Sequence, residues 1–126
     1  MIIGIGADII EIHRVTRAME SKGFVKRCFT PDECRILASK GPAAAVNFAG
    51  KEAVAKALGT GFRGFGPGDV EILRDAMGKP YVQLYNGAKR LADDRCIQHI
   101  HISLSHCQAY AVAYVVAEST KGDDGK

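Results

Sequence analysis

Two carboxylates and one lysine have the residue types and the spacing for phosphate chemistry supported by a divalent cation. Asp8 lies in an N-terminal segment of small and apolar residues, while Glu52 and Lys56 lie in NFAGKEAVAKALGTG, residues 47–61. Mg²⁺ commonly binds through one or two carboxylates, and substrate phosphates and waters complete its octahedron. Lys56, one helical turn from Glu52, could then neutralise a phosphate oxygen. The three residues therefore indicate phosphoryl transfer by positioning and charge neutralisation.

A simpler interpretation of Glu52 and Lys56 is a salt bridge on the surface of a helix, which contributes roughly 0.3–0.5 kcal/mol. However, alanine occupies every fourth position from 45 to 57 around the pair, and Gly50 lies in mid-helix. Glycine there costs about 1 kcal/mol relative to alanine. A helix with so little bulk around a carboxylate is expected to pack closely against another element or a ligand. The glycine-rich loop after it could let phosphates lie against backbone.

Other binding motifs fit the sequence less well. GIGADI begins like a dinucleotide fingerprint, but Ile9 occupies the place of the third glycine and no helix opens there. No Gly-Lys pair is followed by Ser or Thr, so a P-loop is not indicated. His99, His101 and His106 raise the possibility of zinc, but serines continue the same strand face and no cysteine pair accompanies them. A polar strand face or a phosphate contact explains these histidines better.

The N-terminal segment, residues 2–12, predicts the strand that carries Asp8. Successive side chains point to opposite faces of a strand. One face here is apolar and the other bare except for a carboxylate; the apolar face carries Ile3, Ile5, Ala7 and Ile9. Glycine weakens a strand, so Gly4 and Gly6 beside Asp8 indicate that something approaches this backbone closely.

The rest of the chain predicts helices first and strands later. A basic segment, 13–28, is expected to be helical at least through Ser21 or Lys22, and Thr30-Pro31 with Glu33 predicts a capped helix start. An alanine-rich helix is expected over 43–58 and a loop over 59–69. Two strands then surround a turn at 78–80, followed by a short helix near 86–95 and a C-terminal hairpin whose second strand is central. We therefore predict an α+β fold with a mostly antiparallel sheet packed against the long alanine-rich helix.

Length and composition bound the class of protein. The chain has 126 residues, of which 47% are hydrophobic and 25% charged, and its net charge is +3. This predicts one domain over residues 1–120 and a frayed polar tail over 121–126. Four isolated cysteines, no secretory leader and no apolar run of about 20 residues favour a cytoplasmic protein with reduced thiols and no membrane association.

The basic segment offers a surface for a partner. Its cations surround a few apolar residues, and the simplest interpretation is a solvated amphipathic helix. Nucleic acid is a weak alternative because the net charge is small and aromatics are few. An acidic protein that docks by charge and a few apolar anchors fits equally well. The residues concerned are Arg14, Arg17, Met19, Lys22, Phe24, Val25, Lys26 and Arg27.

Four motifs resemble one family in order and spacing. GIGADIIEI, FAGKEAVAKALGTG, GKPYVQL and HISLSHCQAYAVAYVV are similar to segments of bacterial holo-[acyl-carrier-protein] synthases, of the 4′-phosphopantetheinyl transferase superfamily. The resemblance covers residues 1–118. It implies the fold of that superfamily and a Mg²⁺-dependent enzyme that moves 4′-phosphopantetheine from coenzyme A to a serine of an acidic apo acyl carrier protein. Adenosine 3′,5′-bisphosphate is the implied second product, fatty acid biosynthesis the implied process, and a homotrimer with sites between subunits the implied assembly.

The resemblance also implies roles for individual residues. Asp8 and Glu52 correspond to the metal ligands, and Lys56 to a lysine that contacts phosphate and assists the leaving group. The implied coenzyme A contacts are Lys56, Gly59, Lys79, Pro80, Ser105 and His106. The implied carrier-protein contacts are Arg14, Arg17, Met19, Phe24 and Arg27.

Some questions stay open in the sequence. Asn47 replaces an arginine usual in the family and Gly50 replaces an alanine, so the neutralisation of the nucleotide phosphates on that side is unassigned. The base that accepts the serine proton is not identified, and a metal-bound water or Glu52 are candidates. A module that only binds coenzyme A or an acidic protein, and a nucleic-acid-binding domain, are the alternative functions.

Overall fold

The computed structural model describes residues 1–37 and 41–120, and antiparallel pairing joins all of its paired strands. The elements are β1 (Ile2–Glu11), α1 (Ile12–Ala18), α2 (Lys22–Cys28), α3 (Pro31–Ile36), α4 (Ala43–Ala57), the 3₁₀ turn η1 (Pro67–Asp69), β2 (Val70–Arg74), β3 (Pro80–Leu84), α5 (Asn86–Asp94), β4 (His99–His106) and β5 (Tyr110–Glu118). The predicted α+β architecture is confirmed. The tail predicted at 121–126 lies outside the described residues, as does part of the predicted break before α4, and the single domain at 1–120 stays a prediction.

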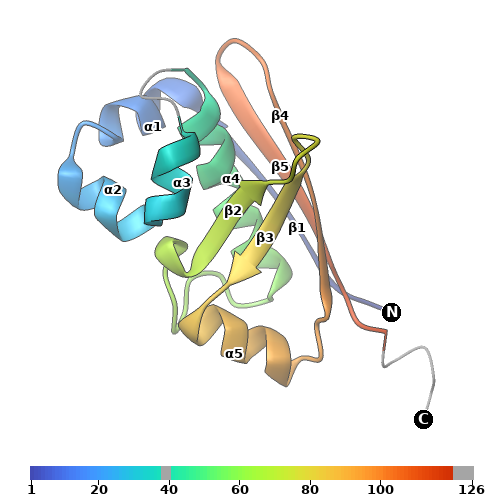
Figure 1. The fold of residues 1–126 in the computed structure, drawn as a ribbon. Coiled ribbons are helices and arrows are strands. Elements are labelled where there is room, and N and C mark those ends of the chain that lie inside the picture. The colour runs from blue at the N-terminus through green and yellow to red at the C-terminus, as the bar shows by residue number, and fades with distance from the viewer. Residues whose placement is uncertain (38–40, 121–126) are drawn as a thin grey trace.

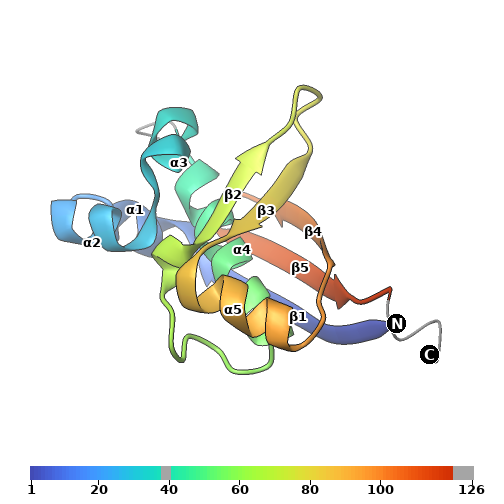
Figure 2. The same cartoon turned by 60° about the horizontal axis from the view of Figure 1, so that its bottom comes forward.

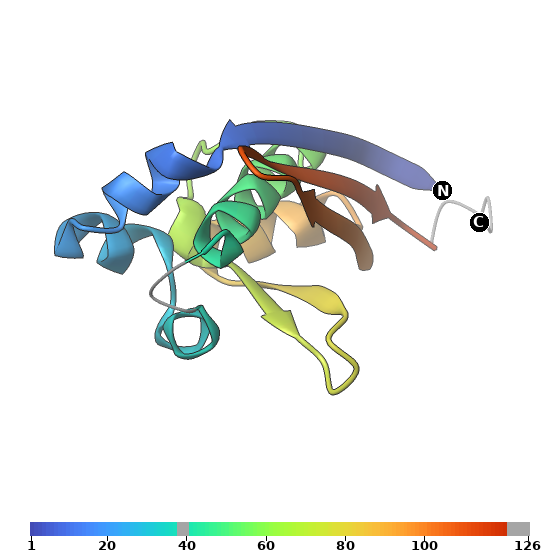
Figure 3. The same ribbon diagram turned by 90° about the horizontal axis from the view of Figure 1, so that it is seen from above.

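Helix α4 is the centre of the molecule. Figure 3 shows it between a three-stranded sheet, in the order β1-β5-β4, and the β2–β3 hairpin. Helices α1 to α3 lie toward one end and α5 toward the other (Figures 1 and 2). Eleven of the 15 residues of α4 are buried. A helix that is apolar or small all round is buried on all sides, which explains its run of alanines.

The glycines of β1 let α4 lie directly on the strand. A Cβ atom at Gly4 or Gly6 would overlap the carbonyl oxygen of Ala57 or Ala53, respectively. The close approach predicted at this strand is therefore confirmed, and its partner is α4. Gly50 has the same function on the opposite side of α4, where a Cβ would overlap the side chain of Ile72 on β2.

The bare face of β1 points toward α4, and its apolar face points away. Ile5 and Ile9 are 70% and 64% exposed, and Tyr114 on the adjacent strand β5 is 61% exposed. Large apolar side chains gathered on one open sheet face mark an interaction surface. We call this set, Ile3, Ile5, Ile9, Tyr110 and Tyr114, the open apolar face.

One prediction about the helices is wrong. The basic segment does not form a helix through Ser21 or Lys22; α1 ends at Ala18, and α2 begins at Lys22. The reason is a cap, because the Ser21 hydroxyl accepts a hydrogen bond from the Phe24 amide at 3.2 Å and starts a new helix. The capping box predicted at Thr30 and Glu33 is confirmed.

A buried ion pair joins α3 to α4. The Lys51 ammonium lies 2.6 Å from the Glu33 carboxylate, and both side chains are fully buried. Lys51 also donates to the carbonyls of Pro67 and Val70. Burial lowers the pKa of Lys51, and Glu33 opposes that shift.

Substitution of one partner of this pair should be costly. We expect Lys51→Met to destabilise the protein by about 3 kcal/mol, because it leaves the buried Glu33 carboxylate without its cation and the carbonyls of Pro67 and Val70 without their donor. Urea denaturation measures the loss. Lys89→Met is the matched control, since Lys89 forms an exposed pair with Asp93 and its loss should cost less than about 0.5 kcal/mol. Equal stabilities of the two variants would contradict the assignment.

Candidate active site at the junction of β1 and α4

Asp8, Glu52 and Lys56 come together where β1 lies on α4. Asp8 follows Gly4 and Gly6 on the strand face that meets the helix. Asp8 and Glu52 line one surface hollow of about 400 Å³, together with Arg14 of α1. Lys56 lies one turn further along α4 and lines a neighbouring hollow with Asp8 and Tyr114. The site is therefore built from three elements and borders the open apolar face.

The lysine of this group contacts Asp8. Its ammonium donates to the Ala7 carbonyl at 2.9 Å and lies 3.3 Å from the Asp8 carboxylate. The surface salt bridge between Glu52 and Lys56, the simpler interpretation of the sequence, does not form within ion-pair distance. Lys56 is half-exposed, so its third donor can meet an anion.

Glu52 is a partly buried carboxylate that lacks compensation. No donor or cation among residues 1–37 and 41–120 lies within hydrogen-bond or ion-pair distance of it. Burial raises the pKa of Glu52, the nearby Asp8 carboxylate raises it further, and Lys56 lowers it by less. Buried charges are normally paired or bind metals. Two adjacent carboxylates with one uncompensated are a donor set that fits a divalent cation.

A cation at this point needs ligands beyond the protein. In the described part of the chain, no group of three or more His, Cys, Asp or Glu side chains forms a metal cluster. Two carboxylates alone suit Mg²⁺, which takes its other ligands from substrate phosphates and water. His101, considered for zinc in the sequence, pairs with Glu118 at 2.8 Å.

The other predicted coenzyme A residues lie elsewhere. Lys79 and Pro80 lie at the turn between β2 and β3, and Ser105 and His106 at the end of β4. None of the four lines the hollows that contain Asp8. Gly59, directly after α4, has φ +96° and lies against the Arg95 guanidinium, a cation that the sequence analysis did not assign. One chain therefore does not bring all the predicted residues to one place.

The predicted carrier-protein residues lie on α1 and α2. Arg14, Arg17 and Arg27 are exposed, and Arg14 also lines the hollow of Glu52. Met19 lines an apolar groove of about 540 Å³ together with Phe29. The Phe24 ring packs inward, 5.7 Å from the ring of Phe48 on α4.

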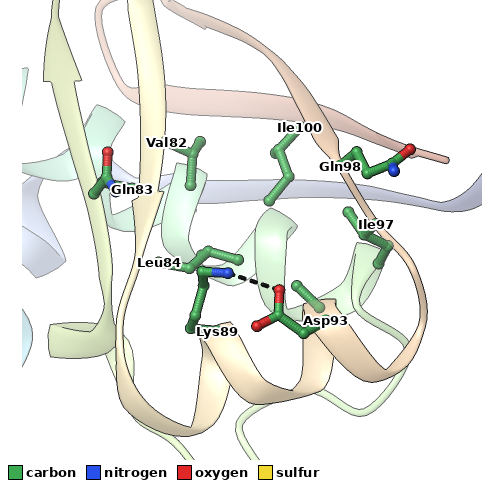
Figure 4. Close-up of a pocket in the computed structure, with 9 residues that line it drawn as sticks. Val82, Gln83, Leu84, Lys89, Asp93, Ile97, Gln98 and Ile100 are labelled. Atoms are coloured by element: carbon green, nitrogen blue, oxygen red, sulfur yellow. Dashed lines mark hydrogen bonds and ion pairs between the residues drawn. The ribbon is translucent and has the colours of Figure 1, made fainter. Parts of the chain in front are cut away.

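A further hollow, of about 210 Å³, contains no predicted site residue (Figure 4). It lies between α5, β3 and the start of β4, and Leu84, Ile97 and Ile100 line it. The Lys89–Asp93 ion pair crosses its α5 side at 2.7 Å.

A group of polar residues on the β2 side of α4 was not predicted from the sequence. Asn47 is fully buried, and its amide donates to the Glu33 carboxylate at 3.0 Å and to the Ile72 carbonyl at 2.9 Å. Arg74, the last residue of β2, donates to the Asn47 side-chain oxygen at 2.8 Å. The only sequence signal was the departure at Asn47 from the arginine usual in the family.

No helix in the described part of the chain is both long and apolar enough to cross a membrane.

A family model and a curated relative both match nearly the whole chain. A family model described as the 4′-phosphopantetheinyl transferase superfamily matches residues 4–115. The chain is 48% identical over 118 residues to the holo-[acyl-carrier-protein] synthase of Lachnoclostridium phytofermentans, and the match covers 94% of this chain and 97% of that one.

Solved structures of similar sequence share the fold. The Helicobacter pylori holo-[acyl-carrier-protein] synthase, in complex with coenzyme A, matches with a TM-score of 0.82 and 31% identity, over 90% of this chain and 99% of that one. The Bacillus anthracis enzyme, solved with CoA (3′,5′-ADP), matches with a TM-score of 0.78 and 35% identity, over 95% and 99%.

Proposed function

Because the chain belongs to the holo-[acyl-carrier-protein] synthases of the 4′-phosphopantetheinyl transferase superfamily, we propose that Asp8 and Glu52 hold Mg²⁺ against the diphosphate of coenzyme A. The chain is an enzyme that transfers phosphopantetheine from coenzyme A to acyl carrier protein. The observation that carries the metal assignment is the uncompensated Glu52 carboxylate beside Asp8 in one hollow. When bound, Mg²⁺ neutralises charge on the diphosphate oxygens.

The residues around the two carboxylates fit an in-line displacement. The serine hydroxyl of the carrier attacks the phosphorus that bears pantetheine, and the phosphorus–oxygen bond to the nucleotide breaks. Lys56, whose half-exposed ammonium keeps one free donor, stabilises the charge on the departing adenosine 3′,5′-bisphosphate. The serine proton passes to a base, for which Glu52 and a water molecule are the candidates.

The function is tested by the mass of the product. Apo acyl carrier protein incubated with the enzyme, coenzyme A and Mg²⁺ is expected to gain the mass of one phosphopantetheine group. Addition of EDTA should stop the gain, and restored Mg²⁺ should return it. A carrier that gains no mass would identify a module that only binds coenzyme A or an acidic protein.

We propose a homotrimer with each site between two subunits. The open apolar face is the support, because monomers rarely leave such a face uncovered. It borders the site, since Ile9 and Tyr114 line hollows that contain Asp8. A neighbouring copy on this face could supply the coenzyme A residues that do not line the hollows of Asp8 within one chain, namely Lys79, Pro80, Ser105 and His106.

The acidic carrier is proposed to dock on α1 and α2. Arg14, Arg17 and Arg27 supply exposed charge, Met19 an apolar contact, and Phe24 fixes α2 by packing on Phe48. Arg14 connects this surface to the site because it also lines the hollow of Glu52. A docked carrier would therefore present its serine close to the two carboxylates.

The process served is fatty acid biosynthesis in the cytoplasm, where the four free cysteines stay reduced.

Charge reversal on this surface should slow carrier association. We expect Arg17→Glu with Arg27→Glu to lower the association rate about tenfold at low ionic strength, because electrostatic steering is lost. The difference should shrink as salt screens these exposed charges. Stopped-flow binding at several salt concentrations measures it, with Arg90→Glu on α5 as the matched control. An unchanged rate, or a parallel loss of coenzyme A affinity, would contradict the assignment.

A further inference from the structure

Arg74 is a partly buried cation that has no anionic partner among residues 1–37 and 41–120. Its guanidinium donates to the Asn47 side-chain oxygen at 2.8 Å and to the Leu73 carbonyl at 3.4 Å, and both acceptors are neutral. No carboxylate of the described residues lies within ion-pair distance of it. Burial lowers the pKa of Arg74. Arginine has five donors, so several remain for a ligand.

The nearest charged candidate, Glu33, is already fully used. One of its carboxylate oxygens accepts from Lys51 and from the Thr30 amide, and the other accepts from Asn47 and from the Ile72 amide. Glu33 therefore pairs with Lys51, and it acts on Arg74 only from beyond ion-pair distance, where it opposes part of the effect of burial. A partly buried charge without a direct partner favours the binding of an anion.

Asn47 holds the guanidinium in place. Its amide nitrogen donates to two buried acceptors, so its oxygen must point toward Arg74. Arg74 lies opposite Pro80 in the β2–β3 ladder, and Lys79 follows at the same end of the hairpin. This end projects away from α4 in Figure 3. Two cations thus lie at one exposed hairpin end, and one of them is seated by a buried amide.

We propose that Arg74 binds the 3′-phosphate at the nucleotide end of coenzyme A. This inference rests on the proposed function, in which Asp8, Glu52 and Lys56 hold the diphosphate. Arg74 lies on the β2 side of α4, at the hairpin end that also carries Lys79 and Pro80, and in the proposed trimer this end belongs to the neighbouring copy. Because Asp8, Glu52 and Lys56 already hold the diphosphate, the anion at Arg74 is a different phosphate. The ribose phosphate is the one that remains.

Asn47 is a neutral residue of α4, and it seats a cation that β2 carries. In the proposed trimer, the Arg74 that meets the nucleotide comes from the copy that does not supply Asp8 and Glu52. A guanidinium matches phosphate geometry with two parallel hydrogen bonds.

Comparison of coenzyme A with 3′-dephospho-coenzyme A tests the inference. The unmodified enzyme is expected to prefer coenzyme A in kcat/KM. Arg74→Gln, which keeps a donor for Asn47, should lose about 10- to 100-fold with coenzyme A and almost nothing with the dephospho form. Arg74→Lys should retain part of the preference. Arg90→Gln on α5 is the matched control and should change neither value.

The outcomes separate this inference from the proposed function. An equal loss with both coenzymes would show that Arg74 has a structural role only, and an unchanged preference would also overturn the inference. If Arg74→Gln fails to fold, Arg74→Lys carries the same comparison. An unmodified enzyme that modifies the carrier equally well with both coenzymes overturns the inference alone. One that modifies no carrier with either coenzyme overturns the proposed function.

Discussion

Replacement of Asp8 or Glu52 by alanine is expected to reduce phosphopantetheine transfer at least about a thousandfold, because the proposed cation loses one of its two protein ligands. Asp8→Asn and Glu52→Gln should fail nearly as completely, since an amide lacks the charge that Mg²⁺ requires. The carrier mass assay at saturating coenzyme A and Mg²⁺ measures the loss. Near-normal turnover in any of these variants would overturn the metal assignment.

The same variants should keep the fold. Within the described part of the chain, Asp8 forms one ion pair, with Lys56, and no donor contacts the Glu52 carboxylate. Removal of Glu52 also relieves its repulsion by Asp8, so Glu52→Gln should melt at the same temperature as the parent or slightly higher. Mg²⁺ with coenzyme A should raise the Tm of the parent but not of Glu52→Gln. Asp94→Asn, an exposed change on α5, is the matched control for both measurements.

A charge on the open apolar face is expected to dissociate the trimer and to stop the reaction. Ile5 is 70% exposed in one chain, so Ile5→Glu should leave the fold of the monomer intact. In the assembly, that change would bury a carboxylate without a partner. The free-energy cost of burying an unpaired charge is large enough to destabilise the interface. Light scattering should show a fall from trimer to monomer mass. Activity should fall at least about a hundredfold because half of each site is missing.

The control for this experiment is an equal change on another surface. Ile36 on α3 is 46% exposed and lies outside the three-stranded sheet. Ile36→Glu should keep both the mass and the activity of the parent. A trimeric Ile5→Glu variant would show that the open apolar face is not the interface. A monomeric variant with full activity would show that one chain contains the whole site.

The elements with a local cause were predictable from the sequence. The capping box at Thr30, the turn at Gly78 and the alternation in β1 depend on residues within a few positions of one another, and all were confirmed. The helix expected beyond Ala18 failed for an equally local reason, a Ser21 cap that competes with continuation of α1. Spacing alone also identified Glu52 and Lys56 as neighbours on one helix.

The sequence by itself determined the order of the elements except for the break between α1 and α2, and it determined the close approach at the glycines of β1 and the charged residues near that approach. Only the tertiary structure decided which partner each charged side chain contacts. A partner four residues away on the same helix competes with partners that the fold brings close from distant parts of the chain. Lys56 contacts Asp8 and not Glu52, Lys51 pairs with Glu33 across 18 residues, and Arg74 reaches Asn47 across 27. The alternation of residue types in β1 defines two strand faces, but it does not determine which of them packs against another element. In the structure, the small residues of α4 pack on the glycine face of β1, and the isoleucine face is therefore exposed.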